Sequence, residues 1–106
     1  MVQKKNTNLE ILKKFKKRLG NIGIDKLILF GSRAKGNFKK DSDFDILVIS
    51  KKFKGVKWNE RSLYIYLNWR EKIPLEVLCY TPEEFEKGKN QVGIIQEALK
   101  TGIEIN

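Results

Sequence analysis

The first apolar positions of the chain are spaced as on one face of a helix. They recur every three or four residues: Leu9, Leu12, Phe15 and Leu19. This is the period of an amphipathic helix. Residues 7–10, Thr-Asn-Leu-Glu, fit a capping box at its start, and Gly20 offers a left-handed stop at its end. We therefore predict a helix over residues 8–19.

Short apolar runs further along the chain predict strands at residues 26–30, 43–50 and 74–80. The first run ends at a Gly-Ser pair, after which a short helix can start at Arg33. Polar turn sequence fills residues 37–42. Residues 103–105 are predicted to add an edge strand.

The segment from Val56 to Arg70 has two readings. Alternation of Leu63, Ile65 and Leu67 with tyrosines suits a strand, whereas the same residues with two tryptophans suit a helix with a wide apolar face. We favour the helix, because the segment is too long for one strand and holds few β-branched residues.

Two more helices are predicted after the last long strand. Residues 81–84, Thr-Pro-Glu-Glu, supply an N-cap, a first-turn proline and a capping-box acid. A last helix over residues 91–100 carries Val92, Ile95 and Leu99 on one face and stops near Gly102. Helices that alternate with short strands predict a two-layer α/β fold.

Length and composition limit the possible architectures. The chain has 106 residues, of which 41% are hydrophobic and 33% charged. These values predict one folded domain over residues 1–106, because a disordered chain buries too little apolar area. Its apolar runs are far shorter than the ~18 residues of a membrane span, and the N-terminus lacks the apolar core of a signal peptide. We expect a cytoplasmic protein with no membrane partner.

The absence of histidine restricts the possible chemistry. With no histidine, the chain cannot provide imidazole catalysis or a histidine zinc site. Cys79 is the single cysteine, so it has no intrachain disulfide partner, and its apolar neighbours predict a buried thiol. Any chemistry must rest on carboxylates, hydroxyls, basic groups and bound metal.

The charge balance permits two interpretations. The chain has 22 basic and 13 acidic residues, a net charge of +9. An anionic partner such as a nucleotide, RNA or an acidic protein face explains the excess, and so does a lysine-rich solvated surface. Charge alone does not decide between them.

Acidic residues gather around one predicted strand. Asp43 and Asp45 are two positions apart, so their side chains leave the same face of a strand. Their mutual repulsion is relieved by a hard divalent cation such as Mg²⁺ or Mn²⁺. Glu76 is the acid within the next apolar run, and it becomes a third ligand if its strand lies beside the second. Taken alone, Asp43 and Asp45 also suit turn or cap positions. Glu76 also suits an exposed edge acid or the partner of a lysine.

A candidate phosphate site precedes these acids. Gly31 and Ser32 follow the first strand and open a short helix. Free backbone amides at such a turn point toward an anion, and the Ser32 hydroxyl adds a donor. Arg33 and Lys35 add positive charge nearby. A Gly-Ser pair by itself also suits an ordinary tight turn.

Together, these motifs resemble a known family. Residues 31–36 read Gly-Ser-Arg-Ala-Lys-Gly, and residues 42–48 read Ser-Asp-Phe-Asp-Ile-Leu-Val. This combination resembles the signature of the minimal nucleotidyltransferases of the DNA polymerase β-type superfamily, and the similarity resumes over residues 74–85. The resemblance implies a mixed sheet with helices on one side, two Mg²⁺ ions, and transfer of a nucleoside monophosphate from a triphosphate, with ATP the expected donor.

The resemblance also implies a role for each matching residue. Gly31 and Ser32 hold the terminal phosphates, and Asp43 and Asp45 bind the metals. Glu76 holds the metal that activates the incoming hydroxyl and assists its deprotonation. The family more usually has aspartate at this third position. The longer glutamate side chain predicts a looser metal geometry and slower turnover.

Partner expectations follow from the same resemblance. Many minimal nucleotidyltransferases are antitoxins of a helical HEPN ribonuclease toxin, and some are thought to adenylylate a toxin tyrosine. We therefore expect a protein adenylyltransferase with such a partner. Aromatic residues of the 56–70 region belong either to that interface or to the core: Trp58, Tyr64, Tyr66 and Trp69. Two alternatives stay open, an antitoxin that acts by binding alone and a basic RNA-binding module.

Overall fold

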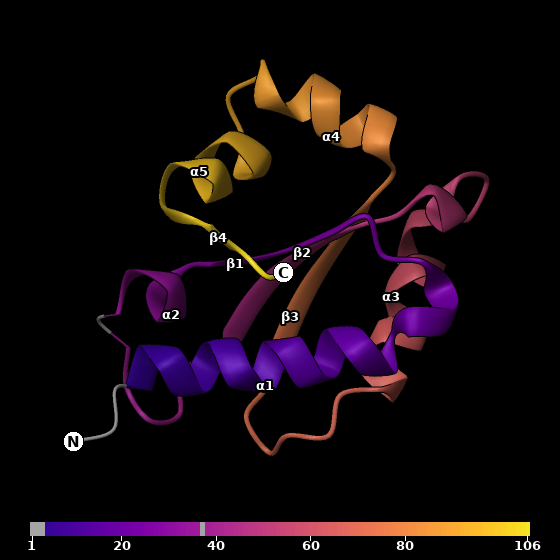
Figure 1. The fold of residues 1–106 in the computed structure, drawn as a ribbon. Helices are drawn as coiled ribbons and strands as arrows, with labels where there is room; N and C mark the ends of the chain where they lie inside the picture. The colour runs from indigo at the N-terminus through magenta and orange to yellow at the C-terminus, as the bar shows by residue number, and fades with distance from the viewer. Residues whose placement is uncertain (1–3, 37) are drawn as a thin grey trace.

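A mixed four-stranded sheet forms the centre of the fold (Figure 1). The computed structural model describes residues 4–36 and 38–106. The strands are β1 (Lys26–Phe30), β2 (Phe44–Ile49), β3 (Leu75–Tyr80) and β4 (Ile103–Glu104), in the order β3-β2-β1-β4. β1 runs antiparallel to both β2 and β4, whereas β2 and β3 are parallel. The predicted strands, including the edge strand, are therefore confirmed.

Helices occupy both faces of this sheet (Figure 1). The helices are α1 (Lys4–Arg18), α2 (Ser32–Lys35), α3 (Trp58–Leu67), α4 (Pro82–Lys89) and α5 (Ile94–Thr101). Short 3-10 turns lie at Gly20–Ile22 and Lys51–Phe53. The helical interpretation of the 56–70 region is thus confirmed.

The strands bury side chains on both faces because their apolar residues are nearly continuous. On one face, α1 and α3 enclose the larger core, which includes Phe15, Phe44 and Ile65. On the other face, Phe85 of α4 and Ile95 of α5 pack over the sheet. The mixed α/β sheet is confirmed, but the expectation of helices on one side and two layers is corrected, because α4 and α5 form a smaller additional layer.

The helix ends depart from the sequence predictions in two places. α1 already includes Lys4, so Thr7 lies inside the helix and does not cap it. Gly20 opens a 3-10 turn, and the left-handed backbone falls at Gly23, with φ of 75°. By contrast, the capping box at Thr81 and Glu84 is present as predicted.

The apolar face predicted for the last helix is only partly present. α5 begins at Ile94, so Val92 lies before it and is 98% exposed, and Leu99 is 41% exposed. Of the three residues predicted to share this face only Ile95 is buried, and Ala98 completes the contact with the sheet. Among the described residues, no helix combines the length and apolar character required to cross a bilayer.

α3 covers the outer edge of β3. The backbone amide of Val77 donates to the Tyr66 hydroxyl at 3.3 Å, and Arg61 Nη1 donates to the carbonyl of Cys79 at 3.2 Å. Arg61 also pairs with Glu84 of α4 at 2.6 Å. Burial raises the pKa of Cys79 to about 12, so the thiol is the inert apolar group that the sequence predicted.

Candidate active site

The strand directions bring three chain segments to one end of the sheet. Because β1 is antiparallel to β2, the last residue of β1 lies beside the first residues of β2, and Phe30 pairs with Asp45. Because β2 and β3 are parallel, their first residues are also neighbours, and Asp45 pairs with Glu76. Neighbouring strands lie about 4.8 Å apart. Glu76 therefore stands next to Asp45, as the predicted third ligand requires.

The paired acids share one face of the sheet. Leu47, two residues after Asp45, belongs to the core beneath α4 and α5, so Asp45 points to that side. Asp45 is half-buried, whereas Glu76 and Asp43 are exposed. Asp43 lies just before β2, so strand alternation does not fix its direction.

The three acids interact electrostatically. The pKa of Asp45 is raised from 3.8 to about 6, first by burial and then by the negative charges of Glu76 and Asp43. Ionised Asp45 is therefore unfavourable unless a positive charge lies nearby. A divalent cation with oxygen ligands meets this requirement, so the donor set fits Mg²⁺ or Mn²⁺.

The acids do not form a complete metal cage on their own. Within residues 4–36 and 38–106, no group of three acidic, histidine or cysteine side chains has the spacing to hold an ion. Mg²⁺ is commonly bound by one or two carboxylates together with substrate phosphates and water. The arrangement suits an ion that arrives with a triphosphate, and the ligand roles of the three acids stay predictions.

Gly31 lies directly against Asp45. Its φ is 74°, which disfavours a side chain, and a Cβ atom there would lie 2.5 Å from Asp45 Oδ2. Glycine thus permits both the turn after β1 and the close approach of the carboxylate. Ser32 then begins α2, in which the amides of Ala34 and Lys35 donate to the carbonyl of Gly31, whereas those of Ser32 and Arg33 have no partner among the described residues. The free amides of Ser32 and Arg33 and the Ser32 hydroxyl remain the candidate phosphate donors.

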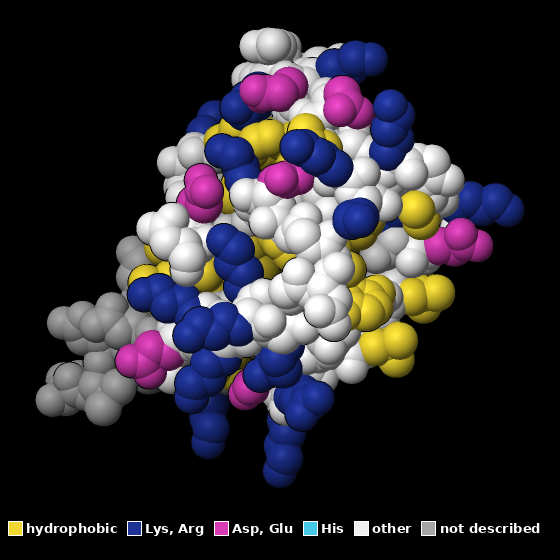
Figure 2. Space-filling model, turned by 45° about the vertical axis from the view of Figure 1, so that its right-hand side comes forward, with side chains coloured by type: hydrophobic (Ala, Val, Ile, Leu, Met, Phe, Trp, Pro, Cys, Tyr) yellow, Lys and Arg dark blue, Asp and Glu magenta, His cyan; other side chains and the backbone are white. Residues whose placement is uncertain are grey.

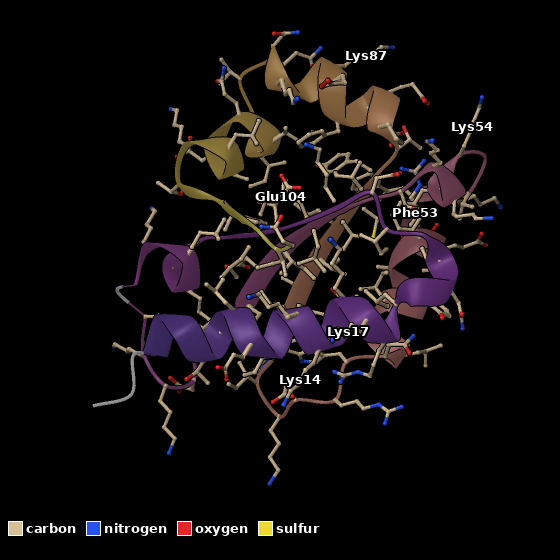
Figure 3. The ribbon with its side chains drawn as sticks, viewed as in Figure 1. Lys14, Lys17, Phe53, Lys54, Lys87 and Glu104 are labelled. Atoms are coloured by element: carbon tan, nitrogen blue, oxygen red, sulfur yellow. The ribbon has the colours of Figure 1, made fainter. Side chains whose placement is uncertain are left out.

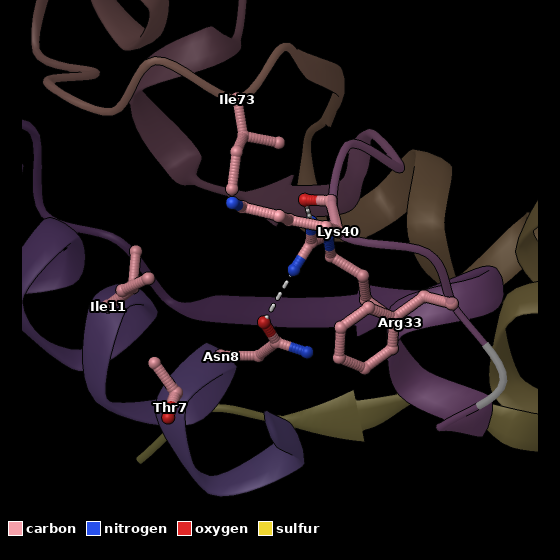
Figure 4. A pocket seen from close by; sticks show the side chains of 7 residues that line it. Thr7, Asn8, Ile11, Arg33, Lys40 and Ile73 are labelled. Carbon is pink, nitrogen blue, oxygen red and sulfur yellow. Dashed lines mark hydrogen bonds between the residues drawn. The ribbon is translucent and has the colours of Figure 1, made fainter.

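The structure corrects the prediction that Arg33 belongs to the phosphate site. Its side chain is only 3% exposed, and its guanidinium donates to the carbonyls of Ser42 at 2.8 Å and Lys40 at 3.0 Å. It also donates to Asn8 Oδ1 at 2.8 Å (Figure 4). Arg33 therefore holds the loop that leads to Asp43 and does not face an anion.

The surroundings of Arg33 explain why the sequence did not reveal this role. The guanidinium packs over the rings of Phe38 and Phe44, at 4.6 and 4.4 Å from the ring centroids. Figure 4 shows the adjacent pocket of about 320 Å³, which Phe38, Arg33 and Asn8 help to line. Asn8 was also missed, although it falls four residues before Leu12 on the buried face of α1. A polar residue among the apolar positions of a helix face was the sequence signal that could have indicated Asn8.

Lys35 ends α2, and its side chain is exposed. Its predicted role toward an anion at the Gly31 turn stays a prediction. Of the seven predicted site residues, the structure gathers Asp45, Glu76 and Gly31 at one point, sets Ser32 next to them, and shows the charge of Asp43 acting on Asp45. It removes Arg33 from the group.

This geometry and the mixed sheet define the class of protein. Residues 9–103 match the family described as the nucleotidyltransferase domain, and the chain belongs to this family. Its fold is the polymerase β-like nucleotidyltransferase fold, and a nucleotide is its expected substrate.

Two similar proteins agree with this assignment. A Methanocaldococcus jannaschii protein named "putative protein adenylyltransferase" is 31% identical over 100 residues, which cover 92% of this chain and 97% of the relative. A crystal structure titled as a "putative nucleotidyltransferase" from Sulfolobus solfataricus superposes with a TM-score of 0.63. That match has 21% identity, covers 79% of this chain and 76% of the other, and bears on the fold alone.

Proposed function

We propose that the protein is a metal-dependent adenylyltransferase that transfers AMP from ATP to a hydroxyl group of a protein. The observation that carries the proposal is the position of Asp45, which lies between Gly31 and Glu76 and has a raised pKa. This arrangement sets paired carboxylates directly beside a turn with free amides. The name of the archaeal relative supports a protein acceptor.

Each group then has a defined part in the reaction. The turn at Gly31 and Ser32 binds the terminal phosphates through backbone amides and one hydroxyl, and Lys35 adds positive charge. Asp43 and Asp45 would hold Mg²⁺, and Glu76 would hold a second ion. When bound, the metal ions neutralise phosphate charge and favour departure of pyrophosphate.

The proposed transfer needs no reactant besides ATP and the acceptor hydroxyl. The acceptor oxygen forms a bond to the α-phosphorus as the bond from that phosphorus to the bridging oxygen breaks. Pyrophosphate leaves with the electrons of the broken bond, and Glu76 accepts the proton of the attacking hydroxyl. Positioning and electrostatic stabilisation supply most of the rate enhancement.

The proposed acceptor is a tyrosine of a HEPN-type toxin, which makes the protein its antitoxin. The sequence resemblance supports this assignment. A second candidate is an antitoxin that blocks its partner by contact alone. The glutamate at position 76, where the family more usually has aspartate, favours it.

Calorimetric titration with ATP and Mg²⁺ tests the site. We expect the wild type to bind and the double variant Asp43→Ala/Asp45→Ala to lose binding by at least about tenfold, while Glu86→Gln, which changes an acid away from the site, retains it. Equal affinity in all three proteins would contradict the site.

Labelled ATP tests the chemistry. With a purified partner, label should reach the partner protein with the wild type and not with Glu76→Gln. We expect Glu76→Asp, which restores the usual family residue, to equal or exceed the wild-type rate. Neutralisation of the toxin that survives both Asp45→Asn and Glu76→Gln would establish the binding-only function instead.

A further inference from the structure

The outward side of α3 carries a concentration of large exposed apolar side chains. We call it the α3 face, and it consists of Trp58, Leu63, Tyr64, Tyr66 and Leu67. Leu63 is 60% exposed and Leu67 is 82% exposed. Figure 2 shows apolar side chains gathered on this side of the molecule. Large exposed apolar patches commonly mark interaction sites.

The core does not account for these residues. Trp69, which follows α3, does pack into the core, with its ring 5.0 Å from Phe15 and 5.2 Å from Phe44. Ile65 is also fully buried. Leu63 and Leu67 lie on the side of α3 opposite Ile65, whereas Trp58 and Tyr66 reach the edge of β3 but stay 51% and 41% exposed. The interpretation as core packing therefore holds for Trp69 and not for these exposed side chains.

The α3 face runs beside the strand that carries Glu76. The Tyr66 hydroxyl accepts a hydrogen bond from the amide of Val77, the residue after Glu76. At the other end of β3, the ring of Trp58 lies 5.1 Å from that of Tyr80. A protein bound to α3 therefore lies along the outer edge of β3, and it reaches Glu76, whose side chain shares the sheet face beneath α4 and α5, by extending around that edge.

Unpaired basic residues flank the α3 face. Arg18, Lys57, Arg70 and Lys72 lie on or next to α3, and none of them takes part in an ion pair among the described residues. Arg18 Nε donates to the carbonyl of Asn68 at the end of α3, while its buried Nη2 has no partner. Two acids, Glu60 and Glu71, are in the same region, so the rim is positive overall.

We propose that the α3 face binds the acceptor protein, through a segment of that protein in which apolar side chains are flanked by acidic ones. The proposal rests on the proposed function, since it holds the acceptor protein along the edge of the strand that carries Glu76. Apolar side chains of the partner pack on Leu63 and Leu67, and its carboxylates approach the basic rim. Such an arrangement gives an apolar centre with a charged rim, as in other protein interfaces.

A peptide probe tests the chemistry of this surface. The probe is a helical peptide with a leucine stripe flanked by glutamates, and its counterpart has lysines in place of the glutamates. We expect the acidic peptide to shift the amide resonances of α3 in isotope-labelled protein and the basic peptide to leave them unchanged. Leu63→Lys/Leu67→Lys should weaken binding by at least about tenfold.

A matched control separates this surface from exposed apolar residues in general. Val92 is 98% exposed and lies away from α3, so Val92→Lys should bind the acidic peptide as the wild type does. No shift at α3, shifts centred elsewhere, or equal loss in both variants would overturn the proposal. Concentration-dependent dimers that Leu63→Lys/Leu67→Lys abolishes would identify a second copy as the occupant and also overturn it.

The same samples distinguish failure of this proposal from failure of the proposed function. Titration with ATP and Mg²⁺ should perturb Asp45 and Gly31 equally in the wild type and in Leu63→Lys/Leu67→Lys. If the nucleotide binds but the acidic peptide does not, the docking surface is wrong and the transferase is retained. If the peptide binds α3 but the nucleotide does not bind, the surface belongs to a protein without transferase chemistry.

Discussion

At the scale of single residues, Asp45 is held in its charged form at a cost to the fold. Its pKa is raised to about 6, so the folded protein binds a proton more tightly there than the unfolded chain does. This group's stabilising contribution is complete below about pH 3.8 and is lost as the pH rises through about 6.

The corresponding prediction concerns Asp45→Asn. Without divalent ions at about pH 7.5, this variant should melt about 5 °C above the wild type, because it removes a repelled charge. At about pH 3 the difference should nearly disappear, since Asp45 is then protonated in the folded protein and largely protonated in the unfolded chain. Calorimetric melting in chelator checks this, and an equal difference at both pH values would show that charge is not the cause.

A second residue-scale prediction concerns Gly31→Ala. A Cβ atom at Gly31 meets Asp45 Oδ2 and forces the carboxylate to move, whereas a Cβ at Gly36 meets no atom within 4 Å. Both glycines have positive φ, but ψ is −157° at Gly31, a region that essentially only glycine adopts, and −1° at Gly36, which is left-handed. Gly36→Ala therefore controls for a positive φ without the contact, at a cost of about 1–2 kcal/mol. We expect both variants to lose stability and only Gly31→Ala to lose ATP binding. Equal affinity of the two variants in calorimetry would contradict the role of close approach.

The sequence could predict that Glu76 lies on a strand with its side chain on a definite face, but it could not predict the burial of Arg33. An acid within an apolar strand stands out locally, and strand alternation determines its face. The partners of Arg33 are carbonyls of Lys40 and Ser42 and the amide oxygen of Asn8, 25 residues away. No local pattern indicates whether a guanidinium meets such acceptors or a phosphate.

At the scale of elements, α2 and the loop before β2 behave as one unit, because Arg33 ties them together. Arg33→Met should lower stability by about 2–4 kcal/mol, since it leaves buried carbonyls without donors. Lys35→Met should leave stability nearly unchanged and weaken ATP binding. Chemical denaturation and ATP titration check both variants. An unchanged unfolding free energy in Arg33→Met would contradict this structural role of Arg33.

The strands were easier to predict than the helix ends. β1 has the bounds that its apolar run predicted, because a buried strand needs only a continuous apolar segment. The helical residues before Thr7 were missed because residues 4–6 are all polar and have no apolar signature. The capping box at Thr81 was visible because both of its hydrogen bonds are local.

At the scale of the whole molecule, the end of β4 joins the two cores. Ile105 follows β4 and is 1% exposed in the core beneath α1, and its amide donates to the carbonyl of Leu27 at 2.8 Å. The chain thus passes from the layer of α5 to the opposite layer within a few residues. The sequence did not reveal this crossing, because an apolar residue near a strand suits either face.

This position predicts a large effect for Ile105→Ala. Removing a fully buried isoleucine side chain should cost about 2–5 kcal/mol. Val92→Ala, at an exposed apolar position, should change stability by no more than about 0.5 kcal/mol. Urea denaturation of both variants checks this, and similar midpoints would show that Ile105 does not contribute to the core.

The covered edge of β3 has a consequence for how the protein behaves at high concentration. Tyr66 and Arg61 occupy hydrogen-bonding groups on that margin, and at the opposite margin β4 spans only two residues and ends in a charged glutamate. Neither margin offers a long unsatisfied backbone on which a strand from another molecule can add. Fibrils built by strand addition are therefore disfavoured, and any association of the folded protein must depend on side chains that a single substitution can alter.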